Sequence, residues 1–458
     1  MKNLKFTERT NLNSILFTFL CCLCLVFCCD IPLSMATSID SLVKCRVETV
    51  RGLLPADETQ NVIVKVTLDA LKPAETTFRP AVNLAIVLDR SGSMNGQKLK
   101  KAKKAAIEAL RRLGKQDIFS VIIYDHNVET IVPAQPAHNT EWIEAKIRQI
   151  QAGGNTALFG GVSQGASEIR KNIGGEYVHR IILLSDGIAN VGPSTPEDLG
   201  RLGAALIKEA ISVTTVGVGT DYNEDLMARL SQNSDGNSYF VESSRDLPRI
   251  FAAELGNVLN VVAKKVHVII ECPEGITPVK IIGRDGRIKG RSVELSMNQL
   301  YGGQEKYALV EIQLRGGKNG QEMEIAKARV SYDNAFTLKR ETASGLVSAQ
   351  FSDNFKKIEK STNVEVKREY ELNRNALEQE KAIGFSDKGK IHSAVQTLKS
   401  SAEKLKDFGM KYDDREVLDE AAEMEAQAEK LEAEGMTQKS RKELRTKSYQ
   451  IKNQQMTK

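Results

Sequence analysis

Two continuous apolar runs in the chain each end in an acidic residue. Residues 84–88 (Leu-Ala-Ile-Val-Leu) lead directly into Asp89, and residues 181–184 (Ile-Ile-Leu-Leu) lead through Ser185 into Asp186. Neither run alternates with polar residues, so each predicts a strand that is buried on both faces, as strands of parallel sheets are. Because ligands of open parallel sheets bind at the carboxyl ends of the strands, we expect the functional side chains where these runs stop.

Segments with helical periodicity alternate with these strands. Leu99, Ala102, Ala106 and Leu110 recur at helical spacing, with basic residues on the opposite face. Helices are predicted over residues 97–113, 141–150, 158–171, 196–210, 223–232 and 247–259, and further strands over 118–124 and 213–218. This alternation predicts an α/β domain with a doubly wound, mostly parallel, Rossmann-like sheet and helices on both faces.

Short candidate strands flank the α/β segment on both sides. The earlier ones are residues 42–50 and 62–68, and the later ones are 266–270, 279–282, 293–295, 307–314, 324–332 and 336–338. Two strands alone are too few to form a domain. We therefore expect the earlier and later strands to combine into one β-sandwich, with the α/β domain inserted between them.

Beyond Ala343 the chain becomes charged and rich in Ala, Leu, Glu and Lys. Three amphipathic helices are predicted over residues 365–383, 388–407 and 415–433, ending near Gly384, Gly409 and Gly435. Residues 413–434 are strongly acidic and residues 439–458 are basic, so we expect these last segments to pair with each other. Such charge runs are typical of a solvated helical face, and partner docking is the alternative.

The N-terminus has the pattern of an export signal. Basic residues near the start are followed by an apolar centre at residues 15–29 and by small residues for cleavage at 34–36 (Ser-Met-Ala). We therefore expect a secreted or cell-envelope protein, periplasmic or extracellular. An uncleaved membrane anchor over residues 10–29 is one alternative, and it would be the protein's contact with the membrane. Lipidation at Cys28 or Cys29 is the second, which Phe27 disfavours because a bacterial lipoprotein signal needs a small residue there.

These patterns divide the 458 residues into five parts. They are a signal peptide at residues 1–36, N-terminal sandwich strands at 37–80, the α/β domain at 81–259, the rest of the sandwich at 260–345 and an α-helical C-terminal region at 346–458. The net charge of +5 is too slight to indicate a nucleic-acid partner.

Five of the seven cysteines lie in the predicted signal peptide, which leaves Cys45 and Cys272 for the mature chain. These two cysteines flank the α/β domain. In an oxidising compartment we expect them to form a disulfide, and two separate buried thiols are the alternative.

Three loops of the α/β domain supply oxygen atoms suited to a metal ion. They contain Asp89-Arg90-Ser91-Gly92-Ser93, a glycine loop that ends in Thr156, and Asp186 followed by glycine. In a doubly wound sheet these loops share one edge, so we expect Asp89, Ser91, Ser93, Thr156 and Asp186 to surround one ion. The alternative is that the two carboxylates only cap helices.

Two carboxylates and three hydroxyls are hard oxygen ligands, which suit Mg²⁺, Mn²⁺ or Ca²⁺ rather than zinc or copper. Mg²⁺ is our first choice, because a compact octahedral site that retains water needs few side chains. Such a site leaves one position for an outside oxygen, and we expect an Asp or Glu carboxylate of a protein partner to take it. Arg90, at the rim, is a candidate to bind the same carboxylate, and a solvated surface arginine is the alternative.

This combination resembles the von Willebrand factor A domain, whose metal-ion-dependent adhesion site consists of Asp-x-Ser-x-Ser, a Thr and an Asp at matching places. The resemblance covers residues 82–258. Residues 213–219 and 222–224 are similar to the subgroup that contains the inter-α-trypsin-inhibitor heavy chains and the so-called calcium-activated chloride channel proteins. The resemblance implies that the five residues above are metal ligands and that the domain binds proteins through a ligand carboxylate.

The residues of the predicted metal site do not indicate an enzyme. The five histidines are scattered and none forms His-Glu-x-x-His, and Ser93 has no neighbouring base to activate it. We therefore predict a non-enzymatic, exported adhesion or protein-binding protein. The alternatives are a scaffold or assembly subunit of an envelope or ATPase-linked complex and, third, a hydrolase that uses the metal.

Overall fold

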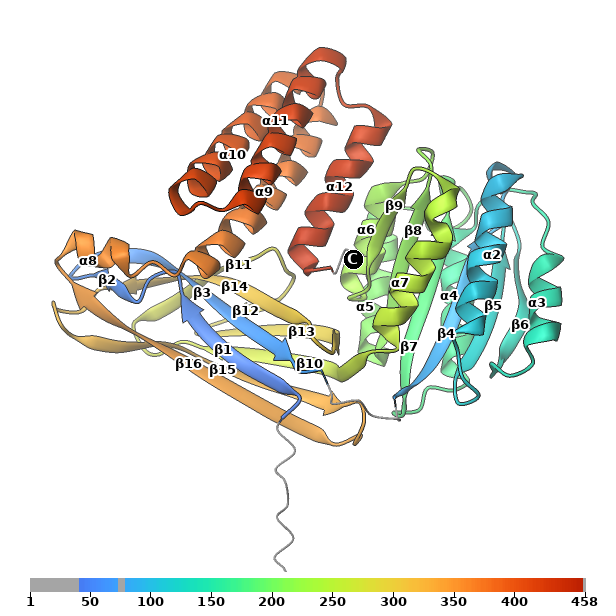
Figure 1. Ribbon diagram of the computed structural model, residues 1–458, viewed down its shortest axis with the longest axis horizontal. Helices are drawn as coiled ribbons and strands as arrows, with labels where there is room; N and C mark the ends of the chain where they lie inside the picture. The colour runs from blue at the N-terminus through green and yellow to red at the C-terminus, as the bar shows by residue number, and fades with distance from the viewer. Residues whose placement is uncertain (1–40, 73–78, 456–458) are drawn as a thin grey trace, which may run out of the picture. The chain divides into compact units, whose positions relative to one another are not determined.

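A six-stranded sheet lies between two layers of helices in the computed structural model, which describes residues 41–72 and 79–455 (Figure 1). Its strands are β4 (Ala81–Asp89), β5 (Ile118–Tyr124), β6 (Val128–Pro136), β7 (Tyr177–Ser185), β8 (Ile211–Val218) and β9 (Ser238–Val241). They are ordered β6-β5-β4-β7-β8-β9, and all neighbours are parallel except β5 and β6. The strand order therefore reverses at β4, whose neighbours are β5 and β7.

Helices cover both faces of this sheet (Figure 1). One face carries α2 (Gln97–Arg111), α3 (Thr140–Arg148) and α7 (Leu247–Val258), and the other carries α4 (Leu158–Arg170), α5 (Pro196–Leu206) and α6 (Glu224–Asn233). Short 3-10 turns lie at η1 (Gly92–Met94), η2 (Ile207–Glu209) and η3 (Ser244–Asp246). Along β4, Leu84 and Ile86 pack under the first layer and Ala85 and Val87 under the second. The predicted doubly wound α/β fold is confirmed.

Two mainly antiparallel sheets pack face to face in the rest of the β structure. One has the order β1-β3-β14-β11 and the other β12-β13-β10-β15-β16-β2, in which β16 and β2 are parallel. The strands are β1 (Val43–Thr49), β2 (Leu53–Pro55), β3 (Thr59–Ala70), β10 (Val261–Glu271), β11 (Ile276–Ile282), β12 (Arg287–Lys289), β13 (Ser292–Tyr301), β14 (Glu305–Arg315), β15 (Glu322–Asn334) and β16 (Arg340–Ser352). Alternate residues such as Val64 and Val66 of β3 and Val268 and Ile270 of β10 form the shared core. The expected β-sandwich with an inserted α/β domain is therefore present.

The last part of the sandwich differs from the predicted strands. Residues 336–338 form the turn between β15 and β16 rather than a strand, and Leu338 has a positive φ of 58°. Strand β16 then extends to Ser352, well past the composition change at Ala343. Its residues alternate between exposed and partly buried positions, and polar residues on the exposed face hide the strand in the sequence.

The expected disulfide between Cys45 and Cys272 is not formed, and both are free thiols. Cys45 lies on β1, whose backbone passes over Gly345 of β16, whereas Cys272 follows β10. Because β15 separates β10 from β16, the thiols are two strand spacings apart along the sheet, about 10 Å, in addition to the gap between the sheets. Burial raises the pKa of each thiol to about 11.

Helices form the C-terminal region, where the fold class predicted them. They are α8 (Phe355–Lys360), α9 (Val364–Ser386), α10 (Ile391–Tyr412), α11 (Arg415–Glu434) and α12 (Gln438–Asn453). Three of them match the predicted helices, but Gly384 and Gly409 lie inside α9 and α10, and only Gly435 follows a helix end. Helix α12 was not predicted. It pairs with α11 through Lys447 and Glu420, whose atoms are 2.8 Å apart.

The predicted export signal, including the alternative anchor, lies outside the described residues. Within the part of the chain that the structure does describe, no helix combines the length and the apolar character needed to cross a bilayer.

Candidate metal centre

Two buried carboxylates lie at the carboxyl ends of β4 and β7, where the strand order reverses. Asp89 is the last residue of β4 and Asp186 directly follows β7, and both are 0% exposed. The backbone N–H of Ser91 donates to Asp89 Oδ1 at 2.8 Å, which holds the tight turn after β4. The two carboxylates therefore lie on adjacent strands at the edge where such sheets bind ligands.

Three hydroxyl groups converge beside Asp186. Ser93 Oγ donates to Asp186 Oδ1 at 2.7 Å, and Ser91 Oγ lies 3.1 Å from Ser93 Oγ. A Cβ atom built on Gly187 would lie 3.2 Å from Thr156 Oγ1, 3.4 Å from Ser93 Oγ and 3.9 Å from Ser91 Oγ. Glycine at position 187 thus keeps open the space that the three hydroxyls surround.

The loop with Thr156 is fixed to its two neighbours by backbone hydrogen bonds. Gly92 N donates to Gly154 O at 3.1 Å, and Gly153 N donates to Arg90 O at 2.8 Å. Gly154 has φ +79°, and a Cβ there would lie 2.3 Å from His126 Nδ1, so glycine is required for the close approach. The structure therefore brings all five predicted residues to one edge of the sheet, and their role as metal ligands stays a prediction.

Sequence reasoning missed three residues that hold this arrangement. Ser185 Oγ donates to Asp89 Oδ2 at 2.7 Å, and Asn190 Oδ1 accepts from Thr156 N at 2.9 Å. Lys98, in the first turn of α2, places Nζ 2.5 Å from Asp186 Oδ2. Ser185 adjoins Asp186 in the chain, which is a weak signal. The roles of Asn190 and Lys98 arise from tertiary contacts alone.

The local charge balance is suited to a divalent cation. Burial raises the pKa of Asp89, the hydrogen bonds from Ser91 and Ser185 oppose that rise, and the charge of Asp186 adds to it. Lys98 brings one positive charge to two buried carboxylates. Hard oxygen donors with residual negative charge are what Mg²⁺, Mn²⁺ and Ca²⁺ prefer, so the residues present fit such an ion.

Arg90 and His126 lie at the rim of the same edge. Arg90 Nε is 3.0 Å from Asp125 Oδ2, and the arginine side chain is 23% exposed. It is therefore not the freely solvated residue of our alternative reading, and Asp125 already binds the guanidinium group that we considered for a partner carboxylate. The His126 side chain is 56% exposed on the loop after β5.

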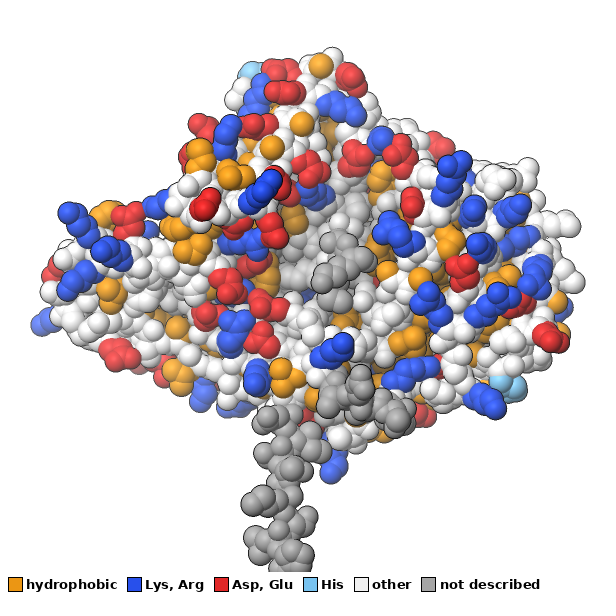
Figure 2. Space-filling view, viewed as in Figure 1, with side chains coloured by type: hydrophobic (Ala, Val, Ile, Leu, Met, Phe, Trp, Pro, Cys, Tyr) orange, Lys and Arg blue, Asp and Glu red, His pale blue; other side chains and the backbone are white. Residues whose placement is uncertain are grey.

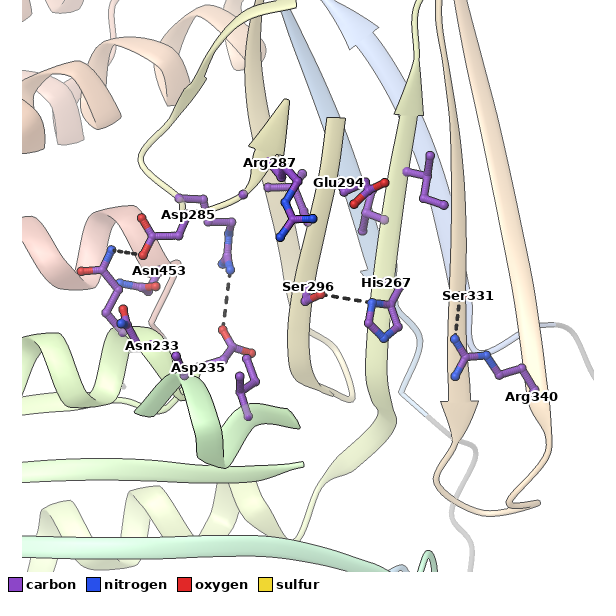
Figure 3. A pocket seen from close by; sticks show the side chains of 18 residues that line it. Asn233, Asp235, His267, Asp285, Arg287, Glu294, Ser296, Ser331, Arg340 and Asn453 are labelled. Carbon is purple, nitrogen blue, oxygen red and sulfur yellow. Dashed lines mark hydrogen bonds and ion pairs between the residues drawn. The ribbon is translucent and has the colours of Figure 1, made fainter. Parts of the chain in front are cut away.

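A cleft of about 840 Å³ lies elsewhere, where the α/β domain meets the sandwich, and none of the five predicted ligands lines it (Figure 3). Its buried carboxylate, Asp235, accepts from Lys306 Nζ at 2.9 and 3.0 Å and lies 3.6 Å from Arg284. Figure 3 shows His267 and Ser296 side by side on the sandwich strands, joined by a 3.1 Å contact. These polar groups bind one another, so the sheet edge remains the candidate functional site.

Comparison with known proteins identifies the class of the α/β domain. The family model described as von Willebrand factor type A domain matches residues 83–253. An uncharacterized protein of Synechocystis is 27% identical over 275 residues, which are 58% of this chain and 64% of that protein. The uncharacterized protein YfbK of Escherichia coli is 26% identical over 282 residues, 60% of this chain and 48% of that protein. The chain thus spans less than two thirds of either relative.

A further relative matches a shorter part of the chain, and two solved structures share the fold. Human inter-alpha-trypsin inhibitor heavy chain H3 is 28% identical over 192 residues, 39% of this chain and 21% of that protein. The structure described as von Willebrand factor type A from Catenulispora acidiphila has a TM-score of 0.71 at 16% identity and covers 90% of this chain and 97% of its own. The ArnB paralog VWA2 from Sulfolobus acidocaldarius has a TM-score of 0.60 at 14% identity, with 90% and 98% covered.

Proposed function

We propose that this chain, whose residues 83–253 form a von Willebrand factor A domain, is a protein-binding module that holds an acidic group of a partner protein through a divalent cation. Members of this domain class typically bind proteins. The observation that carries the proposal is the convergence of three hydroxyls and two fully buried carboxylates at the strand-order reversal of the sheet. We propose that Asp89, Ser91, Ser93, Thr156 and Asp186 are the metal ligands.

The exposure of these residues supports a site that opens to one side only. Asp89, Ser91, Thr156 and Asp186 are buried, whereas Ser93 is exposed. Ser185 holds the carboxylate of Asp89 through a hydrogen bond, and Asn190 holds the backbone of Thr156 in the same way. An ion bound there would supply positive charge to an incoming carboxylate oxygen, and that oxygen would arrive from the side of Ser93. Mg²⁺ is the proposed ion, with Mn²⁺ and Ca²⁺ as the alternatives.

The same contacts favour binding over catalysis. A serine nucleophile needs a base that removes its proton. Ser93 Oγ donates to Oδ1 of Asp186, but the Lys98 ammonium already binds the other oxygen of this carboxylate. We therefore propose a non-enzymatic role. We also propose that the protein is exported, which rests on the signal-like pattern of residues 1–36.

Isothermal titration calorimetry tests the metal site. Mg²⁺ titrated into the wild-type protein should bind, and Asp186→Asn or Asp89→Ala should weaken its affinity by more than about tenfold, because each removes one of the two anionic ligands. Asp221→Asn is the matched control, since Asp221 is an exposed carboxylate on the loop after β8. Equal Mg²⁺ affinity in wild type and Asp186→Asn, with both folded by circular dichroism, would refute the site.

Cross-linked pull-downs from the native envelope test the partner. Proteins captured by the wild type in Mg²⁺, and lost both in chelator and with Asp89→Ala, are the expected ligands. Capture that is unchanged by chelator would show that binding does not use the metal.

A further inference from the structure

Helix α2 and the turn after it carry a strong excess of positive charge. Residues 97–116 contain eight lysines and arginines and a single acidic residue, Glu108. The apolar residues of α2 face the core, so its cations lie on the outer surface. Figure 2 shows lysine and arginine side chains gathered over α2 and the neighbouring α7. Arg249 of α7 and Arg245 of the preceding turn η3 are also exposed.

The protein leaves much of this charge unpaired. Within the described residues, Lys100, Lys101 and Arg112 form no ion pair, and Lys104 has only its helical neighbour Glu108, at 3.6 Å. The C-terminal helices contrast with this, because their lysines find acidic partners between helices. Examples are Lys399 with Glu432 at 2.6 Å and Lys447 with Glu420 at 2.8 Å. An uncompensated row of cations creates a positive potential that attracts anionic partners.

The surface also contains a recess that is large enough to take more than one side chain. A hollow of about 350 Å³ is lined by Lys100, Lys103, Lys104, Ile107, Glu108, Arg111 and Arg148. Lys103 Nζ donates to the carbonyl oxygens of Arg148 and Ile150, each at 2.9 Å, and this joins α2 to the end of α3. The recess therefore has a fixed shape, with several cations around it.

The basic helix begins at the proposed metal centre. Helix α2 starts three residues after the turn η1, and its Lys98 reaches Asp186 directly. With 15 residues, α2 is about 22 Å long, the length of roughly seven residues of extended chain. One extended segment of a partner can thus reach from the metal edge along the whole row of cations.

We propose that the outer face of α2 binds a run of acidic residues in the partner protein, next to the carboxylate that binds at the metal centre. This inference rests on the proposed function and names the chemistry of its partner. A protein segment fits better than a lipid surface, because a helix that binds membranes inserts its apolar face, and that face of α2 is buried in the core.

Fluorescence anisotropy with a labelled poly-glutamate peptide tests the inference on the full-length protein. The triple variant Lys100→Gln, Lys104→Gln, Arg112→Gln should weaken peptide binding about tenfold at low salt and reduce its salt dependence. The matched control is Lys289→Gln, Arg291→Gln, Lys318→Gln, which removes the same charge from exposed positions on the sandwich and should bind like the wild type. Equal weakening by both triple variants would overturn the inference.

Two further arms separate this inference from the proposed function. The α2 triple variant should keep the wild-type affinity for Mg²⁺ by calorimetry, whereas Asp186→Asn should lose Mg²⁺ but keep the part of the peptide binding that persists in chelator. Peptide binding that requires Mg²⁺ and is unchanged by the α2 triple variant would overturn the inference and leave the metal site standing. Binding to phosphatidylserine vesicles but not to the peptide would overturn it in favour of a membrane.

Discussion

At the scale of single residues, Lys98 is expected to influence metal affinity, although it is not part of the ligand motif. Its ammonium group lies 2.5 Å from Asp186 Oδ2, and its side chain is 30% exposed. A divalent ion that draws on the same carboxylate must displace this ammonium or share the oxygen with it. Lys98, in the first turn of α2, therefore competes with the ion for the carboxylate of Asp186.

Replacing Lys98 by methionine should raise the affinity for Mg²⁺ about tenfold, because the competing charge is removed while the length of the side chain is kept. Calorimetry at fixed ionic strength measures the change. Lys101→Met is the control, since Lys101 lies on the same helix without an ion pair among the described residues. An unchanged or lower affinity in Lys98→Met would show that the ammonium does not oppose the ion.

His179 should make the stability of the fold depend on pH. The residue lies on β7 and is 4% exposed. Burial is the main cause that lowers the pKa of His179 to about 4, and the positive charges of Lys264 and Lys265 add to it. A hydrogen bond to the backbone of Gly174 and the charge of Glu176 act in the opposite direction. The His179 imidazole therefore takes up a proton below about pH 6.5 in the unfolded chain, but only below about pH 4 in the folded chain.

The free energy of unfolding should consequently fall as the pH drops from 6.5 to 4, by about 3 kcal/mol at most from this group, and no further below pH 4. His179→Gln should remove this part of the dependence, and His392→Gln, at an exposed position on α10, should not. Urea denaturation at a series of pH values measures both. The same slope in His179→Gln and the wild type would contradict the assignment.

At the scale of elements, a buried ion pair connects three elements of the α/β domain to the sandwich. Glu254 of α7 lies 3.1 Å from Arg180 of β7, and both side chains are almost fully buried. Glu254 also accepts from Thr214 of β8 at 2.5 Å. Arg180 donates to Gln299 at 2.6 Å and to the Tyr301 hydroxyl at 2.8 Å, both on β13.

Neutralising Glu254 by Glu254→Gln should lower the free energy of unfolding by about 3–5 kcal/mol, since the charge of Arg180 is left buried without its carboxylate. The second variant Arg180→Met in that background should restore part of the loss. Glu141→Gln, at an exposed site on α3, is the control. Chemical denaturation measures these differences, and a loss below 1 kcal/mol for Glu254→Gln would mean that the pair is not the main contact.

Elements with a uniform environment were predictable from the sequence. Strand β5 coincides with the predicted residues 118–124, because all of its residues are buried and all but Ser120 are apolar or aromatic. Strand β6 (Val128–Pro136) was missed, since it is a partly exposed edge strand with two prolines. Helix α12 was missed for a related reason, because charged contacts rather than an apolar stripe hold most of it in place.

The meeting of the five candidate ligands was predictable, because Asp89 and Asp186 lie at the ends of buried strands and a glycine loop marks Thr156. The groups that orient them were not. Asn190 reaches Thr156 and Lys98 reaches Asp186 only after the sheet has brought separate loops together. The predicted disulfide between Cys45 and Cys272 was wrong because both cysteines lie near the domain boundaries in the sequence, but the order of strands keeps them apart.

At the scale of the whole molecule, charged contacts attach the last helix to the α/β domain. Arg441 of α12 binds Glu224 and Asp225 at the start of α6, and Asp387 after α9. Arg445 lies 2.6 Å from Asp225. The Tyr449 hydroxyl donates to Gly236 O at 2.7 Å, next to β9. The helical region is therefore held along α6, from its start at the sheet edge of the candidate metal centre to the turn that precedes β9.

The double variant Arg441→Ser, Arg445→Ser should loosen this attachment, because several charge-assisted hydrogen bonds are lost, each worth about 1.5–3 kcal/mol. Hydrogen exchange of α12 should speed up while that of β4 and β7 stays at the wild-type rate. Lys430→Ser, at an exposed position on α11, is the control. Unchanged exchange in α12 would show that its apolar contacts suffice.

The connections of the inserted domain have a mechanical consequence. The chain enters the domain from β3, which lies between β1 and β14, and leaves α7 directly into β10, which lies between β13 and β15. Both anchoring strands are thus interior strands with neighbours on each side. Tension applied by a tethered partner would pull β3 and β10 along their length, against the hydrogen bonds to their neighbouring strands. The force would then be shared by many hydrogen bonds at once. If the proposed partner pulls on the domain, the sandwich would therefore act as its anchor.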